Sequence, residues 1–98
     1  MANSLTSATF LFESRIADAA AGDIDAAYDL GVAYSTGTSG VAYDLIEAHK
    51  WFNLAAIAGN IAAQEARADI AEDMTAREIA AAQRAARDIL YAMRARAA

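Results

Sequence analysis

The chain has 98 residues and a formal net charge of −5, and 57% of its residues are hydrophobic. This length limits it to a single domain, 1–98, which is expected to bury roughly 60 to 65% of its unfolded surface. Cysteine is absent, which excludes disulfides and thiolate metal sites, and no stretch approaches the ~20 apolar residues that a membrane span needs. Residues 1–9 lack the basic and apolar regions of a secretory signal, so we expect a cytoplasmic protein.

Alanine, the strongest helix former, is abundant and proline is absent, so the sequence predicts an all-α protein. Apolar residues recur at helical spacing in a series of segments. These segments span residues 4–21, 24–36, 43–58, 60–73 and 75–96. Asp23 is expected to cap the second helix, and Thr75 and Glu78 form a capping-box pattern at the start of the last one.

Small and aromatic residues recur through the middle of the chain. The pair Gly22 and Ala26 returns, with the same spacing, as Gly59 and Ala63, 37 residues later. A period of ~20 to 50 residues is typical of stacked helical repeats. The residues of this pattern, which we expect to be structural, are Gly22, Ala26, Leu30, Gly31, Tyr34, Gly37, Gly40, Ala48, Trp51, Phe52, Ala55, Gly59 and Ala63.

This spacing resembles the Sel-one-like repeat family, which are α/α-repeat relatives of the tetratricopeptide repeat. The resemblance covers one full repeat over 22–59, preceded by a helix over 4–21 and followed by a degenerate repeat over 60–98 with a long C-terminal helix. It implies a short right-handed α/α solenoid of about five helices that behaves as an adaptor. The alternative is a non-repeating helical bundle in which the same residues form an ordinary core.

Charge is unevenly distributed along the chain, with a net charge of −8 over residues 1–74 and +3 over residues 75–98. The resemblance would place an acidic stripe on the concave side, where it could hold a basic peptide or a partner helix. The stripe consists of Asp25, Asp29, Thr36, Asp69 and Asp73. The alternative is a solvated face whose aspartates complement helix dipoles.

The last helix carries a cationic stripe opposite its apolar face, formed by Arg77, Arg84, Arg87 and Arg94. This stripe could bind an acidic partner, a phosphate or a membrane surface. The alternative is that these arginines complement the helix C-terminus and pair with the acidic body. Overall acidity and the lack of interleaved aromatic residues argue against nucleic acid as a partner.

In the first helix, Phe10 and Leu11 are followed directly by Phe12, and one helix face can bury only part of this run. We therefore expect an exposed apolar edge there, available to a partner or to a second copy of the chain.

The sequence gives little support for a catalytic function. His49 is the only histidine, and we expect it on the outer surface of the third helix. Without a cysteine or a second histidine it completes neither a nucleophile pair nor a zinc site, so we expect no enzyme activity, cofactor or metal. The sequence predicts a non-catalytic protein–protein interaction module, acting as an adaptor or regulator of another protein or as a homo-oligomer. The alternatives are a permanent accessory or structural subunit of a larger complex, including a membrane complex, and a small enzyme.

Overall fold

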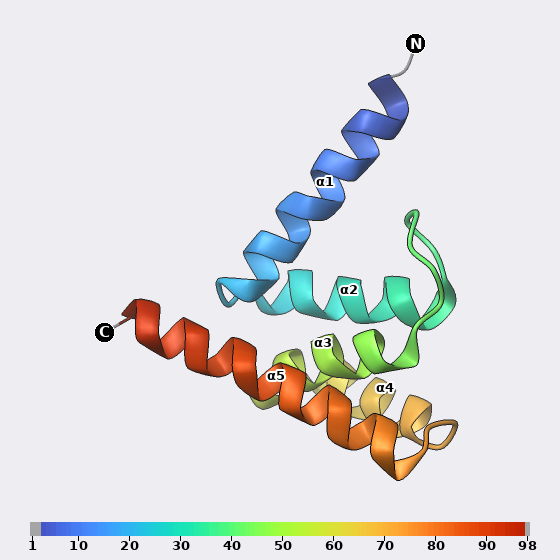
Figure 1. Ribbon diagram of the computed structural model, residues 1–98, viewed down its shortest axis with the longest axis vertical. Coiled ribbons are helices and arrows are strands. Elements are labelled where there is room, and N and C mark those ends of the chain that lie inside the picture. The colour runs from blue at the N-terminus through green and yellow to red at the C-terminus, as the bar shows by residue number, and fades with distance from the viewer. Residues whose placement is uncertain (1–2, 98) are drawn as a thin grey trace.

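The computed structural model describes the backbone of residues 3–97 and the side chains of residues 11–97. This part of the chain is all-helical, which confirms the prediction of an all-α protein (Figure 1). Its helices are α1 (Asn3–Ala20), α2 (Ile24–Thr36), α3 (Leu45–Ile57), α4 (Ile61–Ala71) and α5 (Ala76–Ala97). Each bound lies within two residues of the one expected from the sequence.

The helices begin at residues whose side chains satisfy free backbone amides. Asp23, Asp44 and Asn60 each accept a hydrogen bond from the amide three residues further on, at 3.0, 3.1 and 2.8 Å respectively. At the start of α5, the Glu78 amide donates to Thr75 Oγ1 at 3.1 Å and the Thr75 amide donates to Glu78 Oε1 at 2.8 Å. The caps predicted at Asp23 and at Thr75 are therefore confirmed.

Helix α3 lies at the centre of the molecule. It packs against α2, α4 and α5, whereas α1 packs mainly against α2 and projects away from the other helices (Figure 1). Seven of its residues are buried, and they cover most of its circumference, leaving one side with Lys50, Asn53 and Ile57 less buried. They are Ala48, His49, Trp51, Phe52, Leu54, Ala55 and Ala56.

Most of the core consists of alanine, and its largest fully buried side chains are those of Phe52 and Leu30. Such small side chains let neighbouring helices approach closely. At Gly31 of α2 the approach to α3 is so close that a Cβ atom there would lie 2.4 Å from Cδ1 of Phe52. The Tyr28 ring packs beside Phe52 at a centroid distance of 5.6 Å, and Tyr34 meets Phe12 at 6.0 Å.

The predicted surface position of His49 is wrong. Only 3% of the residue is exposed. The prediction assumed that α3 has a free outer side, but α4 and α5 both pack against this helix. In particular, Arg67 of α4 lies near enough for its charge to affect the imidazole, and it donates a hydrogen bond to Asn53 of α3.

Candidate functional site

The acidic residues predicted to form one stripe, Asp25, Asp29, Asp69 and Asp73, are all exposed. They are spread along the molecule: Asp25 lines a depression beside the turn between α3 and α4, and Asp73 lines another beside Tyr43. The Thr36 hydroxyl, predicted to belong to the same stripe, donates a hydrogen bond to the Val32 carbonyl at 2.7 Å. Over the described side chains, no cluster of three or more histidine or acidic residues could hold a metal ion.

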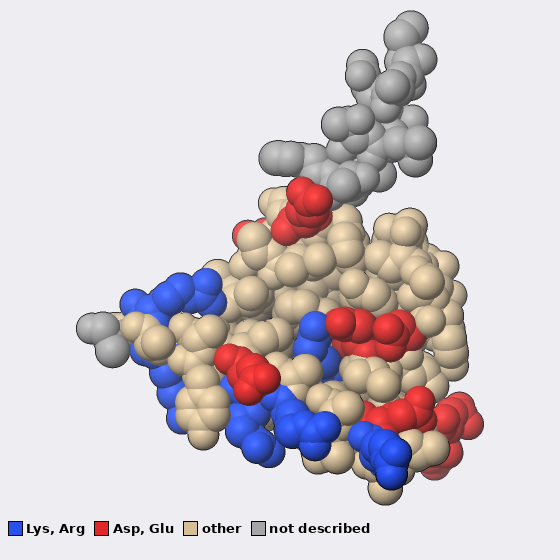
Figure 2. Space-filling model, in the orientation of Figure 1, with Lys and Arg blue, Asp and Glu red and all other residues tan. Residues whose placement is uncertain are grey.

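The four arginines of the cationic stripe, Arg77, Arg84, Arg87 and Arg94, are also exposed. Figure 2 shows basic side chains gathered along α5 on one face of the molecule. Among residues 11–97 the single ion pair joins Lys50 and Glu47 within α3. The stripe therefore forms no ion pair with a described carboxylate of the acidic body, and its charge is available to a partner.

Arg96, which the sequence analysis did not single out, connects the ends of two helices. Its guanidinium donates a hydrogen bond to the Ala20 carbonyl at the end of α1, at 2.9 Å. Carbonyls in the last turn of a helix lack intrahelical partners, and a cation is favourable there. No local signal in the sequence links these two residues, because 76 positions separate them.

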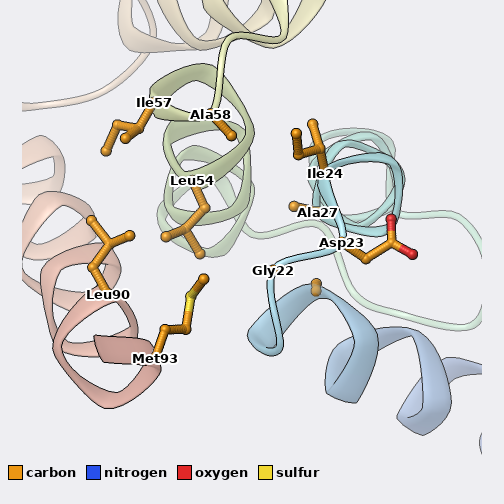
Figure 3. Close-up of a pocket in the computed structure, with 10 residues that line it drawn as sticks. Gly22, Asp23, Ile24, Ala27, Leu54, Ile57, Ala58, Leu90 and Met93 are labelled. Carbon is orange, nitrogen blue, oxygen red and sulfur yellow. The ribbon is translucent and has the colours of Figure 1, made fainter. Parts of the chain in front are cut away.

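An apolar cavity of about 80 Å³ lies where α1, α2, α3 and α5 meet (Figure 3). Leu54 of α3 faces Leu90 and Met93 of α5 across it, and the Asp23 carboxylate points away from it toward the start of α2. Ile57, at the end of α3, forms one edge and is 56% exposed. The cavity is therefore lined by aliphatic side chains and is open at its rim.

A second depression lies next to this cavity, between α3 and α5, since Ile57 and Leu90 line both. Its other lining residues include Ala86 and the more polar Gln83 and Arg87. We call the two depressions together the α3–α5 groove. It combines an apolar floor with a basic edge, and the sequence analysis did not predict it.

Two buried polar atoms in α3, His49 Nδ1 and Trp51 Nε1, have no hydrogen-bond partner among the described residues. Burial lowers the pKa of the His49 imidazole below its ordinary value, and the positive charge of Arg67 lowers it further. His49 is therefore neutral at neutral pH. With 3% of its surface exposed, it is closed to a dissolved substrate in this structure.

The expected apolar edge on α1 is described only in part. Leu11 is 64% exposed and lines a depression with Phe12, Arg15 and Ser39. The side chain of Phe10 lies outside the described residues.

The structure defines the class of the protein as compact and all-helical, with a radius of gyration of 13.5 Å against the ~13 Å usual for 100 residues. No family model, no curated protein and no solved structure matches the chain. None of the helices in the described residues is long and apolar enough to cross a membrane.

Proposed function

We propose that this chain is a protein-binding module, built as a short right-handed α/α solenoid of the Sel-one-like type and acting as a cytoplasmic adaptor or regulator. The observation that carries the proposal is the α3–α5 groove, in which mainly aliphatic side chains line a cavity that is open at its rim. Open apolar depressions on a well-packed protein are typical of sites that receive a side chain or helix of a partner.

The two turns that begin α2 and α4 support the repeat. Gly22 and Gly59 have φ angles of 109° and 104°. The next residues, Asp23 and Asn60, have φ and ψ of −73° and 109° in the first turn and −74° and 111° in the second. Each also donates its amide to the carbonyl five residues before it. The backbone therefore repeats its conformation at the spacing at which the sequence repeats.

A permanent accessory subunit of a larger complex is the second candidate. It is favoured by the position of α1, which packs mainly against α2 and presents Leu11 with 64% of its surface exposed. A helix that projects in this way could be covered by another subunit, including a subunit of a membrane complex.

Affinity capture of the tagged chain from its native cell extract, with quantitative mass spectrometry, tests the proposal. The wild type is compared with Ile57→Glu, which puts a charge at the groove edge, and with Ile61→Glu, which puts the same charge at a 67% exposed residue at the start of α4. We expect a near-stoichiometric partner with the wild type and Ile61→Glu, and its loss with Ile57→Glu.

Equal recovery with all three proteins, or no partner with any of them, would contradict binding through the groove. A chain that is purified alone in folded form, with a cooperative thermal transition, favours the adaptor. A chain that aggregates unless its complex is present favours the accessory subunit.

A further inference from the structure

One face of α5 carries both the apolar lining of the groove and part of the cationic stripe. Gln83, Arg87 and Leu90 all line the groove, and Arg94 lies one turn beyond Leu90 on the same helix face. These residues form a row of about three helical turns, or ~16 Å. The row is long enough to contact about three turns of a helix in a partner protein.

The described side chains do not neutralise the charge of this row. Arg87 and Arg94 are exposed, and neither forms an ion pair with a side chain of residues 11–97. Asp23 is the acidic residue that lines the cavity, but its carboxylate accepts a hydrogen bond from the Ala26 amide at 3.0 Å and points away from Leu54 and Leu90 (Figure 3). A partner entering the groove therefore meets positive charge along α5.

The cavity at one end of the groove determines what else the partner must offer. With a volume of about 80 Å³ and mainly aliphatic lining, it is suited to one small branched aliphatic side chain, since a cavity of ~150 Å³ accommodates benzene. Met93, one of the lining residues, is flexible and can adapt to the inserted group.

Building on the proposed protein-binding function, we propose that the α3–α5 groove binds an acidic amphipathic helix of another protein. An aliphatic side chain of that helix enters the cavity beside Leu54 and Leu90. Its carboxylates, placed one or two turns away on the flank of the apolar face, pair with Arg87 and Arg94. This arrangement joins the apolar and the cationic features of α5 in a single binding mode.

The probes are three synthetic peptides of about 18 residues, each with the same leucine face and with glutamate, glutamine or lysine at the flanking positions. Binding to the full chain is measured by fluorescence polarisation. We expect the glutamate peptide to bind about tenfold or more tightly than the lysine peptide, and its affinity to fall as NaCl rises from about 0.05 to about 0.5 M.

Variants locate the site. Ile57→Glu should weaken binding of the glutamate peptide about tenfold or more, whereas its matched control Ile61→Glu should leave it unchanged. In the double variant with Arg87→Gln and Arg94→Gln, most of the preference for the glutamate peptide over the glutamine peptide should be lost. Thermal melting of every variant establishes that a loss of binding does not reflect unfolding.

Binding of the lysine peptide as tight as that of the glutamate peptide would overturn this inference, as would equal effects of Ile57→Glu and Ile61→Glu. Lack of glutamate-peptide binding up to about 1 mM would also overturn it. So would a dimer of the chain, seen by sedimentation and lost in Ile57→Glu, because the occupant would then be a second copy. In each case the capture experiment still decides separately whether the chain binds proteins.

Discussion

At the scale of single residues, His49 couples folding to pH. Burial lowers the pKa of its imidazole from the ordinary value of 6.5, and the nearby Arg67 charge acts in the same direction. The unfolded chain therefore takes up a proton on this side chain at a higher pH than the folded chain does. The stability that depends on neutral His49 is fully present above pH 6.5 and is lost as the pH falls through the lowered pKa.

We predict that His49→Leu removes most of the pH dependence of stability between about pH 7 and about pH 5, where ordinary carboxylates remain ionised. At neutral pH the variant should be about as stable as the wild type, since it also removes the Nδ1 atom, which has no partner among the described side chains. Urea denaturation across this range measures the effect. Equal slopes of unfolding free energy against pH in the two proteins would show that His49 is not responsible.

At the scale of helices, the contact between α2 and α3 depends on the missing side chain of Gly31. A Cβ atom at this position would lie 2.4 Å from the Phe52 ring, which is 2% exposed and has little room to move. Glycine within a helix costs about 1 kcal/mol relative to alanine. Close packing of the two helices, which the missing side chain allows, offsets this cost.

We predict that Gly31→Ala lowers the free energy of unfolding, because overpacking of ~1–3 kcal/mol outweighs the gain of ~1 kcal/mol in helix propensity. In a Phe52→Leu background, the same substitution should be neutral or stabilising, since the ring atoms that it would meet are gone. A double-mutant cycle by chemical denaturation tests this. Purely additive effects of the two substitutions would mean that a clash with the Phe52 ring is not what makes Gly31→Ala destabilising.

At the scale of the whole molecule, the chain is organised around α3. This helix packs against α2, α4 and α5, so each of these helices loses its main packing partner if α3 unfolds. Helix α1 is attached mainly through α2 and through the hydrogen bond from Arg96 to the Ala20 carbonyl. Local opening of α1 therefore exposes less core than opening of any other helix.

We predict that native-state hydrogen exchange of the helices follows this organisation, with the slowest helical amides in α3 and the fastest in the first half of α1. Arg96→Gln should speed exchange near the end of α1 and leave the amides of α3 unchanged, because it removes a contact at the edge of the molecule. Uniform exchange rates over all helices would contradict this hierarchy.

Much of the secondary structure could be predicted because it is encoded locally. The caps at Asp23 and Thr75 involve side chains and amides three residues apart, so the sequence alone reveals them. The predicted start of α3 was two residues too early. Asp44 takes an extended conformation and acts as the N-cap, so the helix begins only after it. Errors of this size are confined to helix ends.

Features that depend on how the helices assemble could not be predicted in the same way. The surroundings of His49 follow from the packing of α4 against α3, and the sequence pattern of α3 alone does not contain this information. The groove likewise requires Ile57 of α3 and Leu90 of α5 to lie side by side. In the sequence each is simply an apolar residue on an amphipathic helix.

The buried Trp51 side chain can serve as an intrinsic fluorescent probe of this molecule. It is the only tryptophan in the chain, it lies in the central helix, and 3% of its surface is exposed. Its indole emission therefore comes from a single site that water reaches only when the helices around α3 separate. Unfolding, acid titration and the effects of core substitutions can all be followed from this one fluorophore, without an attached dye, in the same sample in which binding is measured.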